Sequence, residues 1–267
     1  MNCLRFRQQW CVLCCLLLLS GCASQFPRTL AVNGPELDRG RAGLERFLEK
    51  SCFRAVDADV RLGWQAYGQH ETYPATLQAM APSFLRCAAV DPLGRPVVLL
   101  VTDGDVFSVV DNRHAEGYVG STDSDFIGRY LPAGISGHDL FFWLSGRIPT
   151  SGLQVLSVRK AAQGTMFWYE LDYGDRMVHR VALDGDHLSR HLVLDEEGRV
   201  VVDVRYGNYS DAAGAGQCAW PATIEISGKD SVAVLSLEFT RIYSFSLLQK
   251  KLFQVQFPDH FTVHRVH

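Results

Sequence analysis

Much of the chain alternates apolar and polar residues with a period of two. In DVRLGWQ (residues 59–65), Val60, Leu62 and Trp64 fall on one face and the polar residues on the other. The same alternation recurs in TMFWYELDY (165–173), RVVVDVRY (199–206) and VAVLSLEFTRIY (232–243). This pattern predicts β-strands with one apolar and one solvated face. We expect Phe167 and Tyr169 to share the apolar face of their strand.

Turn motifs separate the predicted strands. DPLGRP, TDGD, LDGD and DEEG combine the Gly, Pro and Asp residues that are typical of tight turns. Turns spaced so closely favour hairpins, and hairpins join antiparallel strands. The stretches 67–82 and 208–219 lack such a simple pattern and are interpreted as long loops.

Three segments follow a helical repeat instead. Apolar residues of segment 35–50 recur near one face, and Pro35 suits the first turn of a helix. Two shorter helices are predicted over residues 123–131 and 136–145. In the second of these, Ser136 is the expected N-cap, and the apolar face contains Leu140, Phe141 and Leu144.

These elements predict an α+β fold, in which one curved antiparallel sheet is accompanied by an early helix and two short mid-chain helices. A sheet with one apolar face must cover that face, and the predicted helices are few. We therefore expect part of the apolar concave face to be lined by side chains rather than filled.

The N-terminus has the plan of a secretory signal peptide: basic residues Arg5 and Arg7, an apolar run over 11–19, and then Leu19-Ser20-Gly21-Cys22. These four residues resemble the bacterial lipobox, which implies acylation of Cys22 and cleavage before it. The predicted organisation is a signal peptide (1–21), a tether (22–34) and one domain (35–267). Because Ala23 rather than an aspartate follows Cys22, we expect sorting to the outer membrane, facing the periplasm.

Composition narrows the function classes. The formal net charge is −3 and the basic residues are scattered, which argues against nucleic-acid binding. The motifs GxSxG, HExxH, GxGxxG and the P-loop do not occur, so we expect no enzyme, no metal and no cofactor. His187 and His191 are interpreted as surface residues of a solvated face. Beyond Cys22, the cysteines Cys52, Cys87 and Cys218 allow either one disulfide or buried free thiols.

One apolar residue occupies an unusual position. In DPLGRPVVLLV (91–101), Leu93 lies between Pro92 and Gly94 at the tip of a predicted hairpin. Hairpin tips face water and are usually polar. Leu93 therefore either packs back beneath the hairpin or projects outward toward an apolar partner, and the residues alone do not distinguish the two.

The order of motifs resembles the LolA/LolB-like half-barrel lipoproteins. The resemblance rests on the lipobox, the early helix, Pro-Leu-Gly at the hairpin tip, VVDNRHAEGYVG (109–120), LPAGISGHDLFFWLSGRIP (131–149) and WPATIEI (220–226). It implies a strongly curved antiparallel half-barrel whose concave face is covered by short helices. It also implies that the protein binds acyl chains of lipoproteins or lipids and that Leu93 is the protruding residue that aids transfer into the membrane.

The resulting hypothesis is an outer-membrane-anchored, monomeric lipoprotein that accepts lipoproteins from a soluble LolA-like periplasmic carrier and inserts them into the outer membrane. Two alternatives remain: a non-enzymatic interaction or assembly component of an envelope complex, and an unrecognised secreted enzyme. In the first hypothesis the acyl-chain cavity is lined by Val60, Leu62, Trp64, Phe107, Leu140, Phe141, Leu144, Phe167 and Tyr169. The alternative for these residues is an ordinary core.

Overall fold

The computed structural model describes residues 27–50, 53–66, 69–124, 126, 137–210, 219–228 and 233–267. Several predictions from the sequence fall outside these ranges: the leader (1–21), Cys22, Cys52, Ser136, Cys218, residues 211–218 and most of the helix predicted over 123–131. Within the described residues, no helix is long and apolar enough to cross a membrane.

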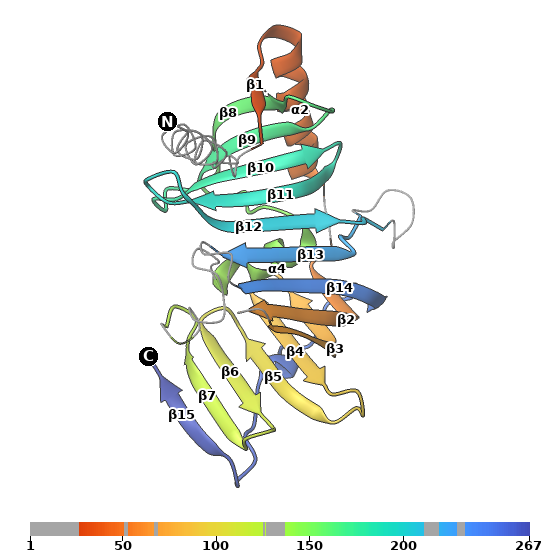
Figure 1. Ribbon diagram of the computed structural model, residues 1–267, viewed down its shortest axis with the longest axis vertical. Coiled ribbons are helices and arrows are strands. Elements are labelled where there is room, and N and C mark those ends of the chain that lie inside the picture. Colours follow the sequence, from red (N-terminus) through yellow and green to blue (C-terminus); the bar gives the residue numbers. More distant parts are fainter. Residues whose placement is uncertain are drawn as a thin grey trace, which may run out of the picture.

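The described strands form one long, strongly curved sheet that does not close into a barrel (Figure 1). Across the sheet, the strands follow the order β1 (Thr29–Ala31), β8 (Gln154–Ala161), β9 (Phe167–Asp172), β10 (Val178–Asp184), β11 (His187–Leu194), β12 (Val200–Gly207), β13 (Thr223–Gly228), β14 (Ala233–Ser244), β2 (Ala55–Ala66), β3 (Gln69–Met80), β4 (Phe84–Val90), β5 (Pro96–Thr102), β6 (Val106–Asp111), β7 (Glu116–Ser121) and β15 (Thr262–Val266). Described neighbours pair antiparallel, as predicted, except that the C-terminal β15 pairs parallel to β7.

Within the part of the chain that the structure describes, four helical elements accompany the sheet: α2 (Gly34–Glu49), η1 (Gly137–Asp139), α4 (Leu140–Ser145) and η2 (Lys250–Phe253). The early helix is confirmed, with Pro35 in its first turn and Leu44 and Phe47 buried. Gly40 allows α2 to lie close to β8 and β9, because a Cβ atom there would be 2.8 Å from a methyl carbon of Val158.

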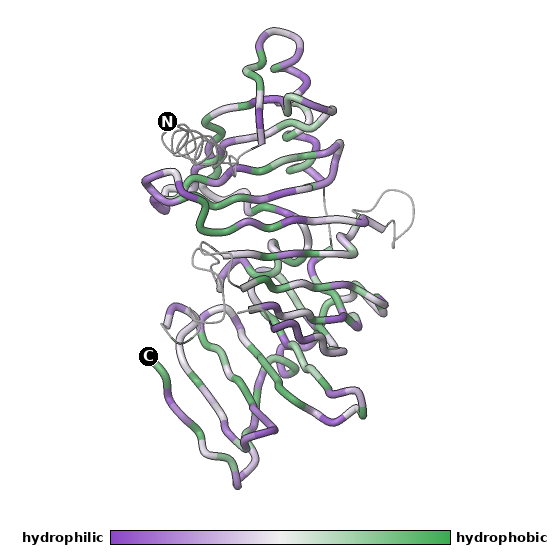
Figure 2. The backbone as a smooth tube through the Cα atoms, viewed as in Figure 1, coloured by the Kyte–Doolittle hydropathy of each residue, from purple (hydrophilic) through white to green (hydrophobic). Residues whose placement is uncertain are grey.

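Apolar and polar residues alternate along most strands (Figure 2), and the two faces of the sheet are covered differently. The concave face packs against α2 and α4 in the main core cluster. The opposite face of β2–β5 has a smaller cluster, built by Met80 and Val101 with residues of the C-terminal segment 248–255. This segment crosses the convex face and leads the chain to β15.

The structure corrects the loop predicted over 67–82. Residues 69–80 form β3, which pairs with β2 from Ala55↔Met80 to Ala66↔Gln69. Pro74 obscured this strand in the sequence because proline cannot donate to a sheet ladder. Pro74 nevertheless fits, since the pairing of β3 with β4 begins only at Ala75. The segment expected to be a tether also contributes a strand, β1, which pairs with β8.

β-Bulges in the β10–β11 and β11–β12 pairings change which face the side chains occupy. At the β10–β11 pairing, Ala182 is opposite Arg190 and Leu183 is opposite Leu188, so Ser189 is the extra residue. At the β11–β12 pairing, Val193 is opposite Val202 and Leu194 is opposite Val200. Val200 therefore packs in a different cluster from Val202 and Val204, although simple alternation grouped the three.

Candidate functional site

Most of the residues predicted to line an acyl-chain cavity meet on the concave face. Val60, Tyr169, Phe141 and Leu144 are buried members of the main cluster, with 2%, 1%, 3% and 7% of their surfaces exposed. Leu62 and Phe167 are half-buried and pack against it. Strands β2 and β9, distant in the sequence, therefore contribute to one cluster. On β9, the Tyr169 hydroxyl donates to the Gly40 carbonyl of α2 over 2.8 Å, so this part of the cluster packs against α2.

Three predicted residues behave differently. Trp64 and Leu140 are half-buried but, unlike Leu62 and Phe167, do not pack against the main cluster. Phe107 is almost fully buried, but it lies on β6, where its ring stacks on Phe126 with 5.8 Å between centroids. The structure therefore places Phe107 in a separate aromatic group and not beneath α4. Alternation identified its face, whereas the distance across the sheet could not be read from the sequence.

The site also includes residues that the sequence reasoning did not assign to it. Trp220 is 2% exposed and contacts the ring of Phe141, with 6.0 Å between centroids, and that of Phe239, with 5.6 Å. Leu44 and Phe47 reach the same cluster from α2. Trp220 is the first residue of the WPATIEI motif. A large aromatic residue just before a predicted strand was the signal in the sequence that could have placed it in the core.

Contacts at both ends of α4 hold it against the sheet and α2. At its start, the amide of Phe141 donates to the carbonyl of Pro82 over 3.1 Å. After its last turn, the guanidinium of Arg147 donates to the carbonyl of Phe47 and lies 3.8 Å from the centroid of the Phe47 ring. Burial lowers the pKa of Arg147 to about 10. Arg147 thus links the end of α4 to the end of α2.

A buried histidine pair lies beneath α4. His179 on β10 and His191 on β11 are 7% and 2% exposed, with 2.9 Å between Nδ1 of His179 and Nε2 of His191. The Trp143 ring of α4 stacks on His191, with 4.3 Å between centroids. The prediction of a surface His191 was wrong, because the bulge at Ser189 turns this side chain to the concave face. His187, before the bulge, is exposed.

Cys87 lies on β4, beside the main cluster. It is half-buried, it is a free thiol, and burial raises its pKa to about 11. A thiol with this pKa stays protonated at neutral pH and is a poor nucleophile. Cys87 therefore acts as an apolar wall residue.

Leu93 lies at the tip of the β4–β5 hairpin and is 77% exposed. The Asp91 carboxylate accepts hydrogen bonds from the amides of Leu93 and Arg95, each over 2.9 Å. Gly94 has φ +79°, a conformation that favours glycine. The turn thus holds Leu93 outward, and the alternative in which it packs beneath the hairpin does not occur.

Solved structures share this architecture at low sequence identity. A LolA superfamily protein from Nitrosomonas europaea superposes with a TM-score of 0.54 at 16% identity, covering 81% of this chain and 97% of that chain. The fold is a LolA-like half-barrel.

Two further solved structures have a similar fold. A domain described as an outer membrane lipoprotein-sorting protein domain, from Vibrio parahaemolyticus, has a TM-score of 0.56 at 12% identity, with coverages of 81% and 97%. A DUF1329 family protein from Desulfovibrio piger has a TM-score of 0.54 at 10% identity, with coverages of 83% and 98%. No protein-family model and no curated protein matches the sequence. This likeness shows the fold alone.

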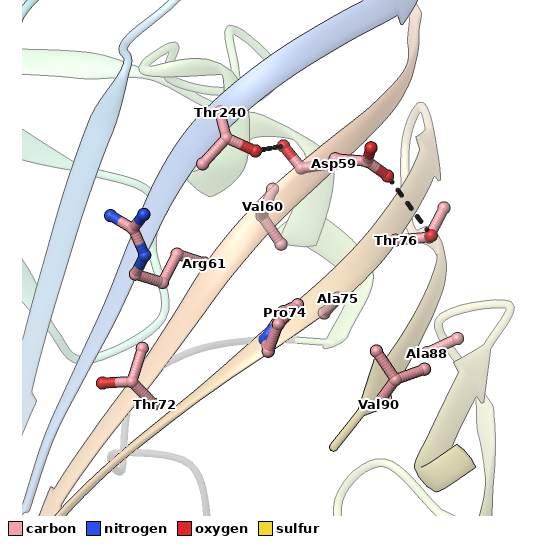
Figure 3. Close-up of a pocket in the computed structure, with 10 residues that line it drawn as sticks. All are labelled: Asp59, Val60, Arg61, Thr72, Pro74, Ala75, Thr76, Ala88, Val90 and Thr240. Carbon is pink, nitrogen blue, oxygen red and sulfur yellow. Dashed lines mark hydrogen bonds between the residues drawn. The ribbon is translucent and has the colours of Figure 1, made fainter. Parts of the chain in front are cut away.

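The outer face of this LolA-type sheet has a groove of a different character. It lies over β14, β2, β3 and β4, and Asp59, Arg61, Thr72 and Thr240 are among its lining residues (Figure 3). Thr240 donates to the Asp59 carbonyl over 3.1 Å. The groove is open, and its lining mixes these polar residues with the apolar Pro74, Ala88 and Val90. Among the residues described, no group of three or more metal-ligating side chains comes together.

Proposed function

We propose that this protein binds acyl chains of lipoproteins or lipids on its concave face, beneath α4. The observation that carries the proposal is the packing of α4: a six-residue helix whose Phe141, Trp143 and Leu144 are buried against the sheet. So short a helix is marginal by itself. Its place depends on packing and on a few end contacts.

An acyl chain would take the place of these side chains. Burying apolar surface is favourable by about 25 cal/mol per Å², so an acyl chain that covers the area now covered by the α4 side chains replaces one apolar contact by another. Exchange of one for the other therefore changes the free energy little. A modest difference in affinity is what a carrier needs, because a cargo held too tightly would not leave for a bilayer.

Delivery is proposed to occur at the outer membrane. In this scheme the acylated Cys22 anchors the protein, a soluble LolA-like periplasmic carrier brings the cargo, and Leu93 contacts the bilayer. The exposed position of Leu93, 77% of whose surface is accessible, supports the last step. No reaction chemistry is required.

Leu62→Glu tests the binding site. The half-buried Leu62 side chain packs against the cluster, and a carboxylate there would make an acyl chain desolvate a charge. We expect binding of a fluorescent fatty-acyl probe to fall at least tenfold, while circular dichroism stays that of the folded protein. The matched control is Arg61→Glu, since Arg61 faces the convex groove. Equal probe affinity in folded wild type and Leu62→Glu would reject this site and favour an envelope-assembly role.

Leu93→Glu tests the transfer step. Because the side chain is exposed, we expect the free energy of unfolding to change by less than about 0.5 kcal/mol. Transfer of a bound lipoprotein to liposomes should fall severalfold, with binding of the cargo retained. Leu247→Glu is the control, since Leu247 is also exposed, at 71%, but lies outside the hairpin. Unchanged transfer by Leu93→Glu would remove this residue from the mechanism.

A further inference from the structure

The contact between His179 and His191 depends on their protonation. With 2.9 Å between Nδ1 of one ring and Nε2 of the other, one of these nitrogens must donate and the other must accept. A ring nitrogen that accepts must be unprotonated. The contact therefore persists only while at least one of the two imidazoles is neutral, and two protonated rings would oppose an N–H to an N–H.

The pair supports α4 directly. The Trp143 ring is 7% exposed and stacks on His191 with an interplanar angle of 17°. Tyr173 meets His179 edge-on, with 4.9 Å between centroids, and its hydroxyl donates to the Pro149 carbonyl beyond α4. A change in the pair thus reaches α4 through Trp143 and reaches the segment after α4 through Tyr173.

Few charged groups face the pair. Asp175, in the loop before β10, places a carboxylate oxygen 3.5 Å from Nε2 of His179. Asp139 at the start of α4 and Asp172 at the end of β9 act on His179 from farther away. On β12, the residue paired with His191 is the apolar Val204. Among the described residues, Nδ1 of His191 has no hydrogen-bond partner, although it is buried.

We propose that His179 and His191 form a proton-sensitive latch, which holds α4 against the concave face when neutral and releases it when protonated. The release of α4 follows from the packing alone. Its consequence, easier entry or exit of an acyl chain, rests on the function proposed above.

The direction of the effect follows from burial. Burial lowers the pKa of His179, although Asp175 opposes this, and burial together with His179 holds the pKa of His191 well below its usual range. When α4 opens, both rings regain contact with water and an ordinary pKa of about 6.5. The closed state is therefore fully favoured above about pH 6.5 and loses its advantage as the pH falls below that value.

Hydrogen exchange of the full-length protein tests the latch. We would measure exchange of a peptide covering α4 by mass spectrometry at pH 7.5 and pH 5.0, corrected for the intrinsic pH dependence of exchange. Each ring that titrates only in the open state should raise the equilibrium constant for opening of α4 by up to roughly 30-fold at pH 5.0 relative to pH 7.5. The double variant His179→Asn, His191→Gln retains a side-chain hydrogen bond that does not titrate, and should lose this response. His187→Gln, at the exposed histidine, should keep it.

The outcomes separate the two proposals. A flat response in wild type, or a full response in the folded double variant, would overturn the latch. If the double variant does not fold, an NMR titration of the wild-type imidazoles decides: rings that titrate near pH 6.5 without changes in α4 resonances would also overturn it. If α4 opens at pH 5.0 and the acyl probe binds at neither pH, the latch stands and the acyl-binding function fails.

Discussion

Replacing Phe141 with alanine is expected to lower the free energy of unfolding by about 3–5 kcal/mol, the usual cost of removing a buried phenylalanine side chain. Phe141 is 3% exposed and packs in the main cluster, where its ring contacts that of Trp220 in the segment before β13. Its loss would remove apolar burial and leave a cavity beneath a helix too short to hold its place alone. Urea unfolding followed by circular dichroism measures the change.

The same variant addresses function. The vacated volume lies where an acyl chain is proposed to bind, so we expect probe affinity to stay equal or rise despite the lower stability. Leu247→Ala, at a side chain that is 71% exposed, should leave both quantities unchanged. A cost below about 1 kcal/mol for Phe141→Ala would mean that α4 does not contribute to the core. A loss of probe binding in a folded variant would mean that Phe141 contacts the ligand rather than being displaced by it.

Cys22→Ser should abolish lipid anchoring altogether. A single acyl chain binds membranes only marginally, whereas two or more hold a protein stably, at about 0.8 kcal/mol per buried methylene. In intact-mass measurements, the wild type should begin at Cys22 and bear acyl chains. The variant should retain the leader and bear none.

Cys15→Ser is the matched control, because Cys15 lies within the apolar leader and is removed with it under the proposal. This variant should be processed and acylated like the wild type. If Cys22→Ser is still cut at the same place and still acylated, the anchor lies elsewhere.

Local pattern in the sequence determined much of the fold. Period-two alternation identified the apolar faces of β2, β9 and β14, since the side chains of a strand alternate regardless of its partners. The repeat of apolar residues together with Pro35 predicted α2. The Pro-Leu-Gly tip predicted a turn, although whether Leu93 packs or projects depended on the hydrogen bonds of Asp91.

Only the tertiary structure decided which faces meet and where alternation breaks. The bulge at Ser189 is a property of the pairing between β10 and β11, and no residue in HLSRHLVLD signals it. That single extra residue moves His191 from the expected surface to a buried site beneath Trp143. β3 was missed in the sequence because Pro74 is unfavourable in a strand. In the structure, the pairing of β3 with β2 outweighs this disadvantage. Phe107 was expected beside Val60, but β3, β4 and β5 lie between β6 and β2. The separation of two strands within a sheet is set by topology, which alternation along one strand does not encode.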